Sequence, residues 1–301
     1  MSRVDVYRRE NWFGFRRRAK AFLGFKPLNA AARAVLPRGP RFSSFPVNLP
    51  EIAGASGDAR FVLLDPMRCS IARELYWGRG RRLVASERFA LELFCRLDRE
   101  AELALDIGAN TGLFSLAAAA SNPSLRVHAF EIVPEVFVAL YRNCARNDVL
   151  DRVVCHHFGL GAEGAVVRLP ETLDAGSLPL SFSSDWDSPG GRKIAFRSLD
   201  SLLPALGAPA RTAVKIDVEG TEDEVFRHGE AFLRVFAPDI VCELLPGAAK
   251  AAFIEPLLKS HGYSFFKIAD GALEPRANLV PEERHHDWFF TKRPERFAGA
   301  P

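Results

Sequence analysis

The chain has 301 residues, of which 48% are hydrophobic and 26% charged, and its formal net charge is +3. This balance excludes a fibrous repeat and a chain that is disordered throughout, and it predicts a globular protein with one main fold. The charge is uneven, because residues 1–41 carry 11 Lys and Arg against Asp5 and Glu10, a net of +9 that leaves the rest at −6. A basic arm on an acidic body favours contact with anionic lipid or another polyanion, and a solvated, frayed N-terminus is the alternative.

The arm mixes Arg with aromatic residues and never collects the unbroken apolar core of a secretory signal. We also expect no membrane-spanning helix, because polar residues interrupt the longest uncharged run, 107–125. The composition of the arm fits an interfacial helix or a transit peptide. Five cysteines without a C-x-x-C pair exclude a disulfide framework and a zinc ribbon, and they indicate a reducing cytosol. Peripheral contact with a membrane is predicted from six basic residues: Arg8, Arg9, Arg16, Arg17, Arg18 and Lys20.

Residues 36–57 contain four prolines and are predicted to form a linker or wrapping segment. A short strand candidate at 61–64 and a helix candidate at 86–97 follow. In the helix candidate, Phe89, Leu93 and Leu97 recur at helical spacing. These elements are expected to form a lid that leads into the main domain.

From residue 102 onward, apolar strands alternate with helices, which predicts a parallel sheet covered on both faces. Two later segments, 263–268 and 287–291, predict an antiparallel pair at the sheet edge. The polar insert at 170–192 has the composition of a functional loop, and its Trp186 could stack on an acceptor or pin the insert to the body. The expected strands are 103–107, 125–130, 153–158, 213–218 and 239–244. The expected helices are 112–120, 135–146, 221–235 and 248–261. The helix expected at 221–235 begins with Thr221-x-x-Glu224, the form of a capping box.

A glycine turn joins the first of these strands to its helix. The strand ends near Asp106 and turns through Gly108 and Gly112. Glycine lets a ligand approach the backbone closely, and a helix N-terminus offers unpaired N–H groups. Asn110 replaces the second glycine of the dinucleotide fingerprint, so the turn predicts a cofactor other than NAD.

An acidic residue ends the second strand. Glu131 closes the string VHAFE, 19 positions beyond Gly112. A carboxylate at this point of such a fold binds both hydroxyls of a ribose, and an ordinary surface carboxylate is the alternative. Together with the glycine turn, it predicts a nucleoside that need not carry phosphates.

The string AVKIDVEGTE places Lys215, Asp217 and Glu219 at alternate positions of a strand. Three charges on an inner strand are costly and are tolerated where the strand ends in a ligand crevice. Asp217 and Glu219 are therefore candidates for substrate contact or proton transfer, and an ion pair with Lys215 is the alternative. The carboxyl ends of parallel strands meet at one edge. Four carboxylates are therefore expected to line one rim: Asp106, Glu131, Asp217 and Glu243.

Histidines offer rival bases. His156 and His157 close the third strand, and His285 and His286 precede the last one. Adjacent strand residues point to opposite faces, so neither pair is an easy chelate and no metal ligands are predicted from them. Only His157 is retained as a candidate, for the base and for the cofactor site, because its strand ends at the expected rim.

These motifs resemble the FkbM-type family of S-adenosylmethionine-dependent methyltransferases. The similarity covers roughly residues 75–292 and rests on LDIGANTGLFS, Phe130-Glu131, Asn143-x-x-x-Asn147 and, above all, VKIDVEGTE. It implies an α/β, doubly wound, Rossmann-like and mostly parallel sheet of class I methyltransferase type. The sequence pattern adds an antiparallel C-terminal edge strand and, outside the part that matches the family, an N-terminal basic, helical extension. We expect an arm and linker at 1–57 and a methyltransferase domain at 58–301, with lid elements at 58–101 and a catalytic core at 102–292.

The resemblance implies S-adenosylmethionine as cofactor and a hydroxyl of a small molecule or glycan as acceptor. The sulfonium already activates the methyl group, so the protein must align the acceptor and remove its proton. Asp217, Glu219 or Glu243 is expected to accept that proton, or to hold a divalent metal that assists. The cofactor contacts implied are Asp106, Gly108, Asn110, Gly112 and Glu131.

No nucleic-acid partner is expected, because the fourth strand ends in Asp-Val-Glu-Gly rather than in an Asn/Asp-Pro-Pro-aromatic string. The expected location is cytoplasmic, with a possible peripheral position at a membrane. The alternative function is a non-catalytic module of the same fold that docks on a membrane or polyanion through its basic arm. The sequence does not predict the oligomeric state.

Overall fold

A computed structural model describes residues 45–48, 60–64, 75, 82, 84–170, 188, 190–245, 248–282 and 285–297. The basic arm and most of the insert, including Trp186, lie outside these residues, so the predictions made for them remain untested. Among the described residues, no helix combines the length and the apolar character needed to cross a bilayer.

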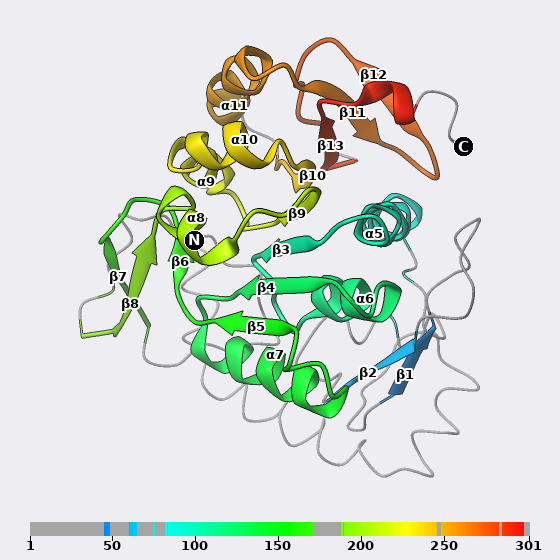
Figure 1. Cartoon of the computed structure of the whole chain (residues 1–301). Coiled ribbons are helices and arrows are strands. Elements are labelled where there is room, and N and C mark those ends of the chain that lie inside the picture. The colour runs from blue at the N-terminus through cyan, green and yellow to red at the C-terminus, as the bar shows by residue number, and fades with distance from the viewer. Residues whose placement is uncertain are drawn as a thin grey trace, which may run out of the picture.

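A mostly parallel sheet forms the centre of the molecule (Figure 1). In the described part of the chain it has eight strands, in the order β12-β11-β13-β10-β9-β3-β4-β5. The inner strands β3 and β9 are buried along their whole length, as expected for a parallel sheet covered on both faces. The predicted fold class is therefore confirmed. The parallel strands are β3 (Leu103–Ile107), β4 (Arg126–Phe130), β5 (Val153–His156), β9 (Thr212–Ile216) and β10 (Asp239–Glu243), and the antiparallel edge consists of β11 (Ser264–Ile268), β12 (Leu273–Arg276) and β13 (Asp287–Thr291).

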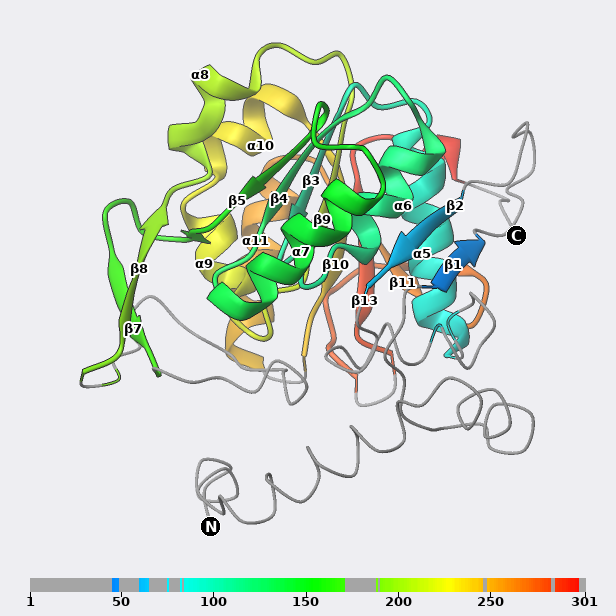
Figure 2. The same cartoon turned by 90° about the horizontal axis from the view of Figure 1, so that it is seen from below.

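Helices cover both faces of this sheet (Figure 2). Successive residues of β3 point to opposite faces, and Ala104 belongs to one hydrophobic cluster while Leu105 belongs to another. The first cluster includes α5 (Ala85–Asp98), α6 (Leu113–Ser121) and α7 (Pro134–Arg146). The second includes α8 (Leu203–Leu206), α9 (Glu222–Arg227), α10 (Glu230–Phe236) and α11 (Ala248–Ser260).

The predicted single helix over 221–235 is wrong, because α9 ends at Arg227 and α10 begins at Glu230. The second helix has its own cap. Asp200, in the short helix η2 (Asp200–Leu202), accepts the backbone N–H groups of Ala231 at 3.1 Å and Phe232 at 2.7 Å. The predicted capping box is also wrong, because no described side chain caps α9. The Thr221 hydroxyl instead donates to the Val218 carbonyl at 3.3 Å.

Two strands flank the polar insert. β7 (Val166–Leu169) and β8 (Arg192–Arg197) form an antiparallel pair that β6 (Gly159–Leu160) extends to a small three-stranded sheet in the described residues. This pair stands away from the main sheet (Figure 2). The Arg192 guanidinium joins it to α7 through two hydrogen bonds to Glu135, of 2.7 and 2.9 Å. The sequence did not predict this hairpin.

Short elements complete both ends of the described chain. β1 (Phe45–Asn48) lies within the predicted linker and pairs with β2 (Arg60–Leu63). At the other end, β12 adds a third antiparallel strand where only two were expected, and Pro275 within it is tolerated because β12 lies at the sheet edge. The short helix η3 (Pro294–Arg296) follows β13.

Candidate active site

A cavity of about 310 Å³ lies at the carboxyl ends of β3, β9 and β10. The turn after β3 and the first turns of α5 and α6 form part of its wall, and Asp287, at the start of the antiparallel strand β13, reaches the same place. Of the nine residues predicted from the sequence, three do not line it: Gly112, Glu131 and His157. The six that do are Asp106, Gly108, Asn110, Asp217, Glu219 and Glu243.

The packing of the two turns explains why residue 108 is glycine. Its φ is +81°, and a Cβ built on it would lie 1.8 Å from the carbonyl oxygen of Asp217. Only glycine allows the turn after β3 and the turn after β9 to approach this closely. Gly112 is also left-handed, with φ +91°, and precedes the first residue of α6.

Asp106 holds strand and helix together. Its Oδ2 accepts hydrogen bonds from the backbone N–H of Ser115 at 2.8 Å and from the Ser115 hydroxyl at 2.6 Å. Burial raises the pKa of Asp106 to about 6, although the Ser115 hydroxyl and the Lys215 charge act in the opposite direction. Asp106 therefore fixes the start of α6 relative to β3 while it lines the cavity.

Glu131 supports the glycine turn. Its two carboxylate oxygens accept the backbone N–H groups of Asn110 at 2.9 Å and Val133 at 2.8 Å. Burial raises the pKa of Glu131 to about 7, against the effect of these hydrogen bonds. The expectation that four carboxylates line one rim thus holds for three of them. Glu131 does not line the cavity, so its binding of a ribose remains a prediction.

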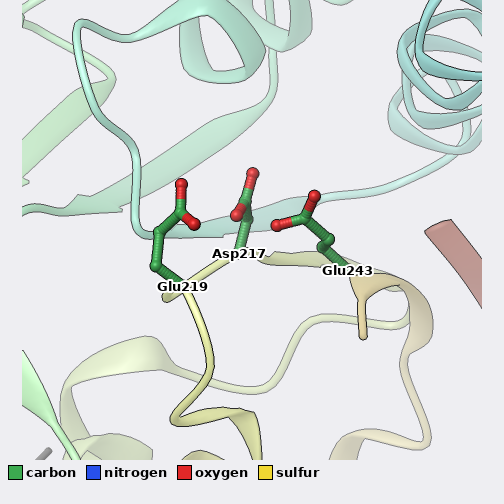
Figure 3. Close-up of side chains that lie close together, drawn as sticks. All are labelled: Asp217, Glu219 and Glu243. Carbon is green, nitrogen blue, oxygen red and sulfur yellow. The ribbon is translucent and has the colours of Figure 1, made fainter. Parts of the chain in front are cut away.

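Asp217, Glu219 and Glu243 gather on one side of the cavity (Figure 3). One carboxylate oxygen from each lies within 4.8 Å of the others. The expected strand over 213–218 ends at Ile216, so strand alternation does not explain the place of Glu219. A turn with φ +55° at Glu219 brings this side chain to the cluster instead.

The positive charge beside this acidic cluster is Lys215. Its side chain is 3% exposed, and Nζ lies 3.0 Å from Asp217 Oδ2 and 5.0 Å from the centre of the Phe114 ring. The ion-pair alternative is therefore correct for Asp217, which also lines the cavity. A divalent metal could bind the three clustered carboxylates, but the ammonium already neutralises one of them.

The three carboxyl groups of the cluster differ in pKa. Burial favours the neutral form of Asp217, but the Lys215 charge and a hydrogen bond with Glu243 outweigh it, so the pKa of Asp217 is lowered. Burial and the negative charge of Asp217 raise the pKa of Glu243 far above its usual range. Glu243 is thus the proton-carrying partner of the pair. Burial, with smaller effects from Asp217 and Glu222, raises the pKa of Glu219 to about 7.

Glu222 fixes the turn that carries the cluster, a role the sequence analysis missed because it gave this residue no part beyond the first turn of the expected helix. It is fully buried, and its Oε1 accepts the backbone N–H of Gly220 at 2.8 Å. Lys250 donates to the Gly220 carbonyl and lies 3.9 Å from Glu222 Oε2. The position of Glu222 at the end of the string VKIDVEGTE was the sequence feature that could have indicated this role.

His156 and His157 lie away from the acidic cluster, whereas His286 lies beside it. The His157 ring stacks on Phe137 at 4.7 Å, outside the cavity wall, so nothing places it near the acidic cluster. His156 stacks on Phe130 at 4.6 Å, and its Nε2 lies 2.9 Å from His128 Nδ1. Among the remaining pair, His286 Nδ1 lies 3.8 Å from Glu243 Oε1.

Comparisons with known proteins show the family of this chain. Residues 106–265 match the family model described as the methyltransferase FkbM domain. The chain is 44% identical over 198 residues to 31-O-demethyl-FK506 methyltransferase FkbM of Streptomyces tacrolimicus, across 55% of this chain and 74% of that protein. It is also 37% identical over 78 residues to methyltransferase sdnD of Sordaria araneosa, a match that covers 26% of each chain.

Similar solved structures include methyltransferase FkbM from Methylobacillus flagellatus, at 15% identity and a TM-score of 0.40 over 75% of this chain and 61% of that one. Another is the O-methyltransferase from Bacillus cereus in complex with SAH, at 14% identity and a TM-score of 0.40 over 68% of this chain and 78% of that one. The family model spans more than half of the chain and contains the glycine turn and the acidic cluster. This chain therefore belongs to the FkbM family of methyltransferases.

Proposed function

We propose that this protein transfers a methyl group from S-adenosylmethionine to a hydroxyl oxygen of a small molecule or glycan. The observation that carries the proposal is the acidic cluster, which faces the same cavity as the glycine turn. A base beside the donor site is what an alcohol acceptor requires, because an alcohol is a weak nucleophile until it loses its proton. The name of the Streptomyces tacrolimicus relative also describes transfer to an oxygen.

The acidic wall of the cavity suits the positively charged sulfur of the donor. The left-handed Gly108 and Asn110 shape the backbone of this wall, and carboxylates dominate the rest of the wall. The donor would supply a methyl group already activated by positive sulfur. We assign the methionine end to the turn at 108–111 and the ribose hydroxyls to Glu131, whose oxygens retain acceptor capacity.

We assign the removal of the acceptor proton to Glu219. Its pKa of about 7 suits a base that works near neutral pH. Asp217, held ionised by Lys215, would orient the acceptor hydroxyl or the proton-carrying Glu243. Gly220 and Glu222 would keep Glu219 at its position through the buried hydrogen bond between them.

Mass spectrometry of cell extracts incubated with the protein and an isotopically labelled methyl donor tests the proposal. We expect one labelled product whose methyl group survives alkaline hydrolysis, since an ether does and a methyl ester does not. Label on nitrogen, or in an alkali-labile ester, would contradict transfer to a hydroxyl.

The test variant is Asp217→Asn, which preserves side-chain shape and removes the charge. We expect it to abolish product formation while its affinity for S-adenosylmethionine, measured by isothermal titration, stays within a few-fold. If the unsubstituted protein shows neither titration heat nor thermal stabilisation with the donor, the non-catalytic docking module becomes the better explanation.

A further inference from the structure

The cavity presents a charge problem to the proposed donor. S-adenosylmethionine carries a sulfonium, an ammonium and a carboxylate, and only its two cationic groups suit an acidic wall. A carboxylate brought next to Asp106, Asp217 or Asp287 would be repelled unless a positive group met it. Among the described lining residues, the positively charged side chains are Arg82 and Lys215.

Lys215 is not available for that purpose. Its ammonium lies between Asp217 Oδ2 at 3.0 Å and the Phe114 ring at 5.0 Å, and only 3% of its side chain is exposed. An added carboxylate would have to displace Asp217 from a buried ion pair, which is costly.

Arg82 differs in that one of its partners is exposed to solvent. Its own side chain is 9% exposed, but the Glu87 carboxylate paired with it is 39% exposed and stands in the first turn of α5. An exposed carboxylate can exchange its guanidinium contact for contact with water at little cost. The backbone of Arg82 is fixed to α5, since Arg88 Nη1 donates to the Arg82 carbonyl at 3.3 Å.

The helix beside Arg82 favours the same ligand chemistry. α5 has 14 residues, and no described side chain caps its N-terminus, where Val84 and Glu87 belong to the cavity wall. Unpaired N–H groups and the positive end of the helix dipole attract an anion there.

We propose that the Arg82 guanidinium binds the carboxylate of the methionine end of S-adenosylmethionine, and that Glu87 holds this guanidinium until the donor carboxylate replaces it. The inference rests on the proposed function. It adds a binding residue from the segment before α5, outside the glycine turn and the acidic cluster. It also orients the donor, with the methionine end toward α5 and the nucleoside toward Glu131.

Isothermal titration with two ligands tests this assignment without any acceptor. The ligands are S-adenosylmethionine and decarboxylated S-adenosylmethionine, which keeps the sulfonium and the amino group and lacks only the carboxylate. The variants are Arg82→Met and, as a matched control for loss of one arginine charge, Arg96→Met in the last turn of α5. The ratio of the two affinities isolates the contact between residue and carboxylate.

We expect Arg82→Met to reduce the preference for S-adenosylmethionine over its decarboxylated form by roughly 10- to 100-fold, as for loss of a charge-assisted hydrogen bond. Arg96→Met should keep the preference of the unsubstituted protein. Glu87→Gln should bind S-adenosylmethionine as tightly or more tightly, because the competing carboxylate is gone.

An unchanged preference in Arg82→Met, or an equal loss of affinity for both ligands, would overturn the assignment. Weaker binding of S-adenosylmethionine to Glu87→Gln would overturn the exchange of carboxylates. If the unsubstituted protein binds neither ligand, the proposed function itself fails, an outcome distinct from these.

Discussion

The acidic residues of the cavity differ in pKa, because their surroundings differ. Glu243 carries a proton, Asp217 is held ionised beside Lys215, and Glu219 has a pKa of about 7. A base acts in its deprotonated form, so we expect kcat/KM to rise as the pH increases through about 7 and to level off above it. A pH–rate profile with the acceptor identified by mass spectrometry checks this.

The variant Glu219→Gln should lose the rise with pH and, in addition, roughly 10²- to 10⁴-fold in rate, the usual contribution of a general base. Its affinity for the donor should stay close to that of the unsubstituted protein. Persistence of the same limb near pH 7 in this variant would remove Glu219 from the base role and leave Asp217 as the candidate.

The sequence predicted the carboxylates that lie at strand ends or within the motifs. It did not predict the cavity residues whose position depends on tertiary packing. Asp217 and Glu243 follow directly from the rule that parallel strands end at one edge. Arg82 and Asp287 come from segments outside the parallel strands, so only tertiary structure shows that they reach the cavity. Glu219 was found for the wrong reason, since a turn rather than a strand positions it.

At the scale of elements, Asn143 of α7 and Asn147, which directly follows this helix, connect β2 to the glycine turn. Asn147 accepts the backbone N–H of Val62 and donates to its carbonyl, both at 2.7 Å. Asn143 accepts the N–H of Leu64 and donates to the Thr111 carbonyl, both at 2.8 Å. The spacing of four residues puts both amides on one side of the helix. The pattern Asn143-x-x-x-Asn147, which contributes to the family resemblance, thus has a structural role.

We expect Asn143→Asp to destabilise the fold by about 2–3 kcal/mol and to weaken donor binding. The new carboxylate still accepts from Leu64, but it cannot donate to Thr111 and it is a charge at a site that is 1% exposed. Chemical denaturation and isothermal titration measure the two effects. Asn147→Asp, at a less buried position, should cost less stability and leave donor binding nearly unchanged. Equal effects of the two variants would contradict a link through Thr111.

The elements themselves followed well from periodicity where a segment was long and apolar. The strands of the parallel sheet and the helices α5, α6 and α7 lie close to their expected ranges. The break between α9 and α10 could not be predicted, because the side chain that starts α10 belongs to Asp200, some thirty residues earlier. The β7–β8 hairpin was hidden by the polar composition of the insert that it flanks.

For the whole molecule, the stacked histidines predict how stability depends on pH. Burial, and then His128 and Arg197, lower the pKa of His156 to about 4. The unfolded chain, in which the pKa is about 6.5, therefore binds more protons between these values. Stability conferred by the neutral ring is complete above pH 6.5 and is lost as the pH falls toward 4.

We expect the unsubstituted protein to lose about 1–2 kcal/mol more stability than His156→Phe between pH 7.5 and pH 5, after allowance for partial exposure of the ring. Phenylalanine can still stack on Phe130 and cannot take up a proton. Denaturant unfolding of both proteins at both pH values gives the difference. Parallel losses in the two proteins would show that His156 does not contribute to the acid sensitivity.

Because Gly108 packs closely against Asp217, the part of the cavity wall formed by the two turns tolerates substitution less well than the part near α5. The backbones of the β3 and β9 turns touch there, so a change of side chain at either turn disturbs both the donor loop and the base. Another part of the wall consists of Val84, which precedes α5, and of Glu87 and Ala90 within it. A library built to change the fit of the methionine end of the donor should vary Val84 and Ala90, keep Glu87 for its proposed exchange with the donor carboxylate at Arg82, and leave the glycine turn untouched.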